Sequence, residues 1–306
     1  MNNKTPKYRN KNWIKSKLPD LYRLATDSEM HEYYLEKIKE SCTLSLQNKT
    51  YRQVYGVIEL HVNCIAVAFL NKGAHEVLSG NQSGWKSLQQ GLTIRAWAAK
   101  LHATYTMLDK QYKNRAVIFA ELYPHALCQA AAMGYDSFAI PYAKLAIENF
   151  YLTKGGDEVW FYTMPFFPFV LKLFGKWLGV EIDLRSDIKN PLGGYQVIFD
   201  HWDYPELLAE DILSICDLHC KESVERGAYP AFLFAPYTVF PVEIMALYRI
   251  RKELGLETPV VDHQLLQNQL NFPPPIFEEI PENEIPDIQV AIERYKHDFP
   301  EPIVGW

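Results

Sequence analysis

The chain of 306 residues is long enough for one large domain or two smaller ones, and its 48% hydrophobic and 14% aromatic content excludes a disordered chain. The formal net charge is only −6, but it is unevenly distributed. Residues 1–23 carry seven basic residues against one acid, a net of +6, whereas residues 257–306 carry ten acids against two basic residues, a net of −8. We therefore expect a basic N-terminal arm over residues 1–24 and an acidic, proline-rich segment over residues 276–306.

The sequence lacks the patterns typical of export or of a membrane span. Its N-terminal stretch has basic residues without the apolar core of a secretory signal behind them. The most apolar window, Trp160–Val180, contains two prolines and two lysines, which argue against a transmembrane helix. The five cysteines are scattered and odd in number, as expected for reduced, buried side chains. We expect a soluble, cytoplasmic protein that binds neither membranes nor nucleic acids.

Hydrophobic periodicity predicts a series of helices in the first half of the chain. Thr26, Asp27, Ser28 and Glu29 form a capping box at the start of one of them. The next is apolar on nearly all sides and should lie inside a bundle, and the third carries many alanines, which permit close approach of a neighbouring helix. In chain order these helices cover about residues 27–46, 51–78, 83–107, 114–134 and 136–150.

The second half is also predicted to be mainly helical. Residues 195–199 are ambiguous, because their apolar run fits a short strand or a buried extended link. Gly255 offers a left-handed end to a late helix, and three consecutive prolines end the next one. The predicted helices of this half cover about residues 165–179, 205–225, 238–254 and 261–270.

Together these elements predict an all-α fold, an irregular bundle of about eight to ten helices. The connections are short and polar, which favours antiparallel neighbours. We expect residues 25–275 to form a single helical domain, with residues 153–157 as its candidate sub-boundary. The acidic segment 276–306 also contains several isoleucines, so we expect it to pack on the surface of this domain.

No motif in the sequence predicts catalysis. Glu59, His61 and Asn63 are spaced by two, which on a helix spreads them over different faces and argues against a common metal ion. Cys216 and Cys220 lie one helical turn apart but lack the second ligand pair of a tetrahedral zinc site. Phosphate-binding loops, nucleophile elbows and metalloprotease motifs are absent from the sequence. We therefore predict no catalytic residue, no metal and no cofactor, and expect a protein that is not an enzyme.

Acidic side chains are the candidate binding residues. One group lies along the polar side of the helix that begins at Pro205, and a second is concentrated within ten residues of the acidic segment. Such carboxylates form either a solvated face or a docking surface for a basic partner, and complementary charge would accelerate association. The candidates are Glu206, Glu210, Asp217, Glu278, Glu279, Glu282, Glu284 and Asp287.

Three stretches are similar to a known family. An alanine-rich helix that begins with tryptophan, Trp85–Met107, precedes a helix that ends in ALCQAAAMG, Ala126–Gly134. In the third stretch, Ile244–Leu266, a late helix is followed by Gly-Leu and an acidic-apolar segment. Over about residues 50–270 this pattern resembles the immunity protein 49 family of bacterial polymorphic toxin systems. The immunity proteins that counter PoNe-type nucleases have a similar helical pattern.

The resemblance implies a stoichiometric inhibitor, made in the cytoplasm, that binds a cognate toxin delivered by a neighbouring cell. Without a signal peptide, the protein would counter a toxin that acts in the cytoplasm. Two alternatives come from other classes. A helical interaction scaffold would require self-similar repeats, which we do not find in the sequence. A helical enzyme would require perturbed carboxylates or histidines that converge on a pocket.

Overall fold

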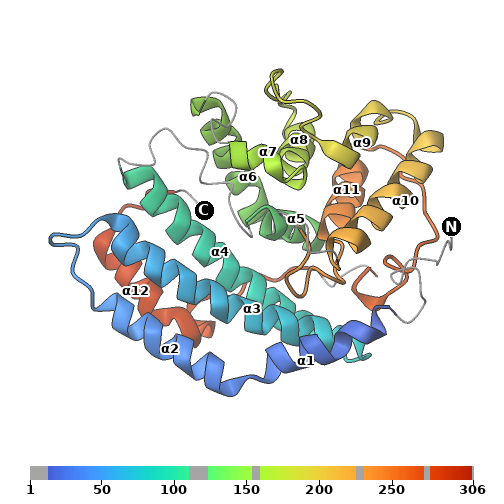
Figure 1. The fold of residues 1–306 in the computed structure, drawn as a ribbon. Coiled ribbons are helices and arrows are strands. Elements are labelled where there is room, and N and C mark those ends of the chain that lie inside the picture. Colours follow the sequence, from blue (N-terminus) through green and yellow to red (C-terminus); the bar gives the residue numbers. More distant parts are fainter. Residues whose placement is uncertain (1–12, 110–122, 154–158, 225–230, 272–275, 305–306) are drawn as a thin grey trace.

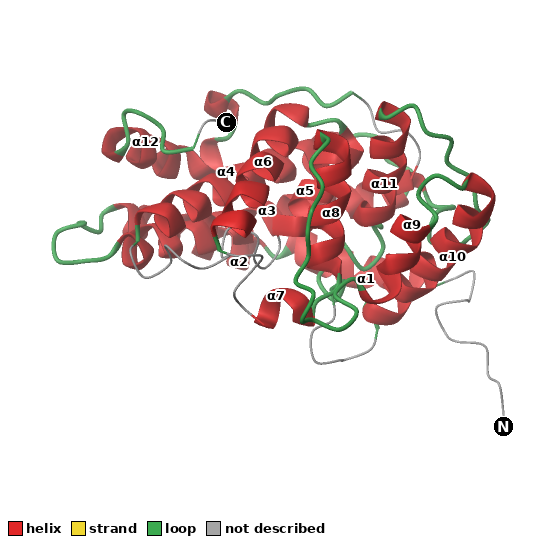
Figure 2. Ribbon diagram, turned by 90° about the horizontal axis from the view of Figure 1, so that it is seen from above, coloured by secondary structure: helices red, strands yellow, loops and turns green. Residues whose placement is uncertain are grey.

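The computed structural model describes residues 13–109, 123–153, 159–224, 231–271 and 276–304 (Figure 1). In these ranges the chain is helical and contains no β-strand, so the predicted all-α class is confirmed (Figure 2). The described residues form twelve α-helices, slightly more than the predicted eight to ten, because four helices, α1, α7, α9 and α12, were not predicted. In chain order the helices are α1 (Leu18–Thr26), α2 (Ser28–Cys42), α3 (Val57–Leu78), α4 (Gly84–Leu108), α5 (Tyr123–Met133), α6 (Asp136–Leu152), α7 (Val159–Thr163), α8 (Phe166–Leu178), α9 (Gln196–Asp200), α10 (Pro205–Glu222), α11 (Val242–Glu253) and α12 (Gln289–Asp298).

Helices α3 and α4 form a tightly packed hairpin in the middle of the molecule (Figure 1). Glycines allow this close approach. A Cβ atom at Gly73 would lie 2.6 Å from the Gly84 carbonyl oxygen, and a Cβ atom at Gly91 would lie 2.8 Å from Leu70 Cγ. The turn between the two helices contains Gly80, whose φ of +91° suits a residue without a side chain. A helix therefore packs closely against α4, as expected, but glycines rather than the predicted alanines lie at these closest contacts.

Helices α1 and α2 pack along the outer side of α3 (Figure 1). Asp27 caps α2 by accepting a hydrogen bond from the Met30 N–H at 3.0 Å, whereas Thr26, the first residue of the predicted capping box, ends α1 and donates to the Tyr22 carbonyl oxygen. Part of the stretch expected to form a basic arm is helical, because α1 begins at Leu18, and Trp13 and Leu21 are buried. Residues 1–12 lie outside the described residues.

The second half of the chain surrounds α11. This helix packs against α5, α8 and α10, and its apolar residues are buried among them. Two local predictions are wrong. Residues 195–199 form neither a strand nor an extended link, because Gln196–Asp200 is helix α9. Residues 261–270 do not form a helix, and only a 3₁₀ turn, Gln269–Asn271, begins near the end of that stretch.

The C-terminal part of the chain returns to the first half. Residues 276–288, called the acidic segment below, run to α12, which packs against α2. Figure 2 shows this path over the helices from the side of α11 to α12. One continuous apolar core extends from Trp13 to Phe299 and includes Ile285, Ile288 and Tyr295. The candidate sub-boundary at residues 153–157 lies almost entirely outside the described residues.

One stretch in the described part of the chain, Arg52–Leu78, is long and apolar enough to cross a membrane by length and composition alone. It consists of α3 and the π-helical turn before it. Because α3 packs against α1, α2 and α4, the same apolar character serves the core of the bundle.

Candidate functional site

The predicted acidic residues of α10 differ in their surroundings. Glu206 and Glu210 are exposed and form no ion pair within the ranges that the structure describes. Asp217 is half-buried, and its carboxylate oxygen lies 3.7 Å from His263 Nε2. Two of the three carboxylates are therefore free to meet a partner, whereas the third already has a neighbour that can carry positive charge.

The acidic segment presents three further free carboxylates. Glu278, Glu279 and Glu284 are exposed, and none of them forms an ion pair with another described residue. The acidic segment contains five acids and no lysine, arginine or histidine. None of these three carboxylates is therefore neutralised by an ion pair within the described part of the protein.

The other two acids of this segment attach it to the body of the protein. Glu282 forms an ion pair with Lys296 of α12. Asp287 Oδ1 lies 3.2 Å from His31 Nε2 of α2. Because these two side chains already form contacts that attach the segment to the protein, Glu282 and Asp287 are weaker candidates for contact with a partner than their exposed neighbours.

The fold does not bring the two acidic groups together. Helix α10 packs against α9 and α11, whereas the acidic segment follows α4 towards α12. Figures 1 and 2 both place α10 and α12 at opposite ends of the molecule. A partner that contacts both groups would have to extend across much of the surface.

Contacts at the beginning of the acidic segment hold it against α4 and the turn between α5 and α6. The ring of Phe277 stacks on Tyr135, with centroids 4.0 Å apart and planes at 15°. Gln89 of α4 donates a hydrogen bond from Nε2 to the Ile276 carbonyl oxygen at 3.3 Å. The Ile276 side chain itself is 90% exposed, so the backbone and not the side chain anchors this residue.

A cavity of about 440 Å³ lies between the acidic segment and the first half of α4. The residues that give it its chemical character are Trp85, Lys86, Gln89, Glu278, Glu279 and Glu284. The three exposed carboxylates thus share one concave surface with an indole ring and a single lysine. This cavity is the candidate functional site, because it gathers free charge in a space that a partner's side chain could enter.

A smaller neighbouring cavity of about 110 Å³ shares Glu279 and also contacts Trp97, Lys100 and Glu282. Its charges are largely matched inside the protein. The Lys100 ammonium lies 4.9 Å from the centre of the Trp97 ring, and Glu282 pairs with Lys296. Burial lowers the pKa of Lys100, and the nearby Glu282 partly opposes that shift.

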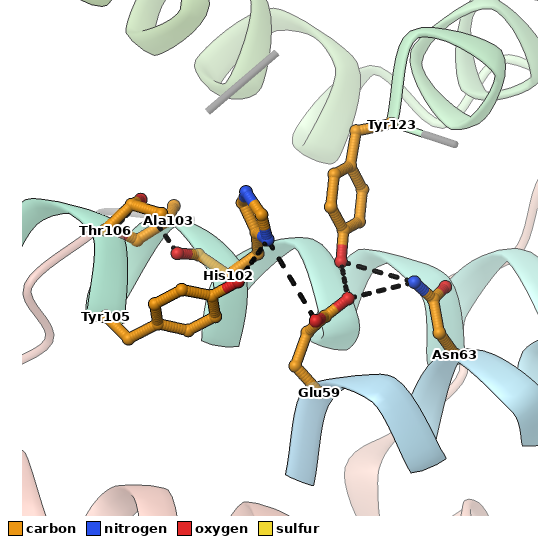
Figure 3. A network of polar contacts seen from close by, with 7 residues as sticks. All are labelled: Glu59, Asn63, His102, Ala103, Tyr105, Thr106 and Tyr123. Carbon is orange, nitrogen blue, oxygen red and sulfur yellow. Dashed lines mark hydrogen bonds and ion pairs between the residues drawn. The ribbon is translucent and has the colours of Figure 1, made fainter. Parts of the chain in front are cut away.

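A buried polar network joins α3, α4 and α5 (Figure 3). The Tyr123 hydroxyl donates a short hydrogen bond to Glu59 Oε1, and Asn63 Nδ2 donates to the same oxygen at 3.0 Å. On the other side, His102 Nδ1 lies 2.9 Å from the Tyr105 hydroxyl and 4.0 Å from Glu59 Oε2. Burial, together with the charge of Glu59, raises the pKa of Tyr123 well above its ordinary value.

This network corrects the prediction made for α3. Glu59 and Asn63 are four residues apart and share a helix face, so they converge, whereas His61 lies beside Tyr34 and Ser41. All the side chains of the network are at most 7% exposed. A substrate in solution has no contact with them, and the network therefore specifies how the three helices pack.

A second buried pair connects α10 with α11. His219 Nδ1 lies 2.7 Å from Glu243 Oε1, and both side chains are fully buried. The His219 ring also stacks on Phe232, with centroids 4.1 Å apart. Burial raises the pKa of the nearby Cys220 to about 12, so this thiol is protonated near neutral pH. Within the described ranges, no group of three or more His, Cys, Asp or Glu side chains is arranged to hold a metal ion.

Sequence reasoning found the acids of the candidate site but missed its other wall. Trp85 is a buried residue in the first turn of α4, and the exposed Lys86 follows it. Nothing in the local pattern connects these residues with a segment almost two hundred positions later. The long-range hydrogen bond between Gln89 and Ile276 shows that α4 and the acidic segment lie side by side and form the two walls of the cavity.

Comparisons with known proteins assign no family to the chain. No protein-family model matches it, and neither curated proteins nor solved structures include a match. The resemblance to immunity proteins therefore stays a prediction from sequence pattern, and function has to be argued from the surface of this structure.

Proposed function

We propose that this protein is an immunity protein that binds and neutralises a cognate toxin acting in the cytoplasm. The observation that carries the proposal is that five of the eight candidate carboxylates are exposed and form no ion pair with another described residue, namely Glu206, Glu210, Glu278, Glu279 and Glu284. Toxins that act on nucleic acids have basic clefts, and complementary charge accelerates encounter with such a partner. Rapid association matters for an inhibitor that must act before the poison does.

The arrangement of the helices supports a compact inhibitor over a repeat scaffold. In a stacked repeat protein each unit contacts only its neighbours along the chain. Here α11 packs against α5, and α12 packs against α2, so distant parts of the sequence meet. The proposed partner is a protein, and the proposed inhibition is stoichiometric binding without a catalytic step, cofactor, membrane or nucleic acid.

The test is co-expression with the protein encoded by the adjacent gene, scored as cell survival, together with a binding titration of the two purified proteins. Wild-type protein should rescue growth and bind the partner, and binding should weaken as salt is raised from about 20 to about 300 mM, because screening removes long-range attraction. Failure of the wild-type protein both to bind and to rescue would sink the proposal.

Charge-reversal variants identify which acidic group makes the contact. We expect Glu206→Lys with Glu210→Lys to report on α10, and Glu278→Lys with Glu279→Lys to report on the acidic segment. All four residues are exposed, so both variants should fold. The variant that disrupts the contact should slow association more at low salt than at high salt. Rescue by both variants, with unchanged association rates, would mean that neither acidic group contacts the toxin.

A further inference from the structure

We propose that the cavity between the acidic segment and α4 receives a cationic side chain, an arginine or a lysine, from the toxin. This inference rests on the proposed function and names the chemistry of its contact. The cavity's volume of about 440 Å³ lies within the range of pockets that bind small molecules, so one long side chain can enter it.

The electrostatics of the cavity select for positive charge. Glu278, Glu279 and Glu284 supply three carboxylates and Lys86 supplies one ammonium group, which leaves a formal charge of −2 among these residues. The three carboxylates have no ion-pair partner among the described residues. An incoming guanidinium or ammonium group could therefore form ion pairs without first breaking one inside the protein.

The indole ring of Trp85 adds a second kind of recognition. Among aromatic rings, indole attracts cations most strongly. Trp85 Nε1 donates a hydrogen bond to Gln82 Oε1 at 3.2 Å, which fixes the orientation of the ring. Trp85 is only 5% exposed, so it forms a rigid inner wall and the carboxylates of the acidic segment form the outer one. A cation between them would contact both walls.

Two other acidic places among the described residues lack this combination. Glu206 and Glu210 of α10 line neither of the two cavities beside the acidic segment. A third cavity, of about 500 Å³ between α2 and α3, also contains two acids. There Asp27 already caps α2, and Lys72 opposes the charge of Glu32.

A tetra-arginine peptide tests the inference directly on the full-length protein. Wild-type protein should bind this peptide at low salt, and a peptide of the same length made of uncharged citrulline should bind at least about ten-fold more weakly. Glu278→Gln, Glu279→Gln and Glu284→Gln combined in one cavity variant should weaken peptide binding by at least about ten-fold. Equal affinity of the wild-type protein for the two peptides would overturn the inference.

A matched control removes the same number of charges elsewhere. Asp203→Asn in the turn before α10, combined with Glu206→Gln and Glu210→Gln in α10, changes three exposed acids that do not line the cavity; this is the α10 variant. This variant should bind tetra-arginine within about two-fold of wild type, because its cavity is intact. If the two triple variants lose affinity equally, the peptide responds to overall charge and the cavity is not its site.

Binding measurements with the toxin distinguish a failure of this inference from a failure of the proposed function. A toxin that binds wild-type protein but binds the cavity variant at least about ten-fold more weakly supports both. A toxin that binds the wild-type protein and the cavity variant with equal affinity overturns the inference and leaves the immunity function standing. If wild-type protein binds tetra-arginine at the cavity but neither binds the adjacent-gene product nor protects against it, the proposed function fails. The inference that the cationic side chain comes from a toxin then fails as well.

Discussion

Phe277 stacks face to face on Tyr135, with ring centroids 4.0 Å apart, and this contact fixes the start of the acidic segment on α5 and α6. The residues on either side contribute little burial, since Ile276 and Glu278 are exposed. This aromatic contact thus positions the outer wall of the candidate site, more than twenty residues after α11 ends at Glu253.

The acidic segment should become locally mobile when this stack is removed. Phe277→Ala removes an aromatic pair that contributes about 0.5–1.5 kcal/mol beyond its buried area, so amide hydrogen exchange over residues 276–280 should accelerate. The melting temperature should change little, because Ile285 and Ile288 still anchor the segment in the core. Phe234→Ala is the control, since that ring is 61% exposed, and its exchange pattern in this segment should match wild type.

The buried network of Figure 3 should be sensitive to loss of its tyrosine hydroxyl. Tyr123→Phe leaves Glu59 Oε1 with one donor fewer inside the protein, and an unsatisfied buried group destabilises by about 1–3 kcal/mol. Urea unfolding should show this loss. Tyr151→Phe removes a hydroxyl that donates to the Glu181 carbonyl oxygen at the surface, and it should change stability by less than about 0.5 kcal/mol. Equal effects of the two substitutions would contradict a structural role for the network.

The α3–α4 hairpin should not tolerate a side chain at Gly73. A Cβ atom there would lie 2.6 Å from both the Gly84 carbonyl oxygen and the Leu88 amide nitrogen, and backbone atoms cannot move aside locally. We expect Gly73→Ala to lower the free energy of unfolding by about 1–3 kcal/mol in chemical denaturation. Gly56→Ala is the control, because its nearest contact is the flexible Arg52 Cγ at 3.2 Å and alanine favours helix. A Gly73→Ala protein as stable as wild type would mean that the two helices can separate without penalty.

Acid should destabilise the protein partly through His125. Burial lowers its pKa to about 3, and the charges of Arg95 and His219 act in the same direction. Between about pH 6.5, the ordinary pKa of histidine, and about pH 3, the unfolded chain therefore binds a proton that the folded protein does not. The free energy of unfolding should fall as pH decreases through this window, by up to about 2 kcal/mol between pH 6.5 and pH 5 from this residue alone.

His125→Gln isolates that contribution. Glutamine keeps an N–H that can donate to the Ala231 carbonyl oxygen, which lies 2.7 Å from His125 Nε2, but it does not titrate. The variant should lose less stability than wild type when urea unfolding at about pH 7 is compared with unfolding at about pH 5. Parallel pH dependences in the two proteins would show that His125 is not responsible.

Local pattern predicted much of the helical fold, and the failures have a common cause. Helix α4 was expected over about residues 83–107 and spans Gly84–Leu108, because apolar spacing and end signals act within a few turns. Residues 195–199 are apolar enough for a strand, but Gln196–Asp200 forms helix α9, which packs against α10. Residues 261–270 have helical spacing without a helix, because tertiary contacts override weak local preference.

The sequence by itself determined the all-α class, the excess of acids near the C-terminus and the eight candidate carboxylates. Only the tertiary structure decided which of them are free, because Asp287 meets His31 and Glu282 meets Lys296 through chain folding. It also decided that the remaining acids of the segment share a cavity with Trp85. The periodicity that predicts a helix extends over only a few consecutive turns of the chain. Which residue contacts another almost two hundred positions away depends on how apolar faces pack, so no local pattern predicts it.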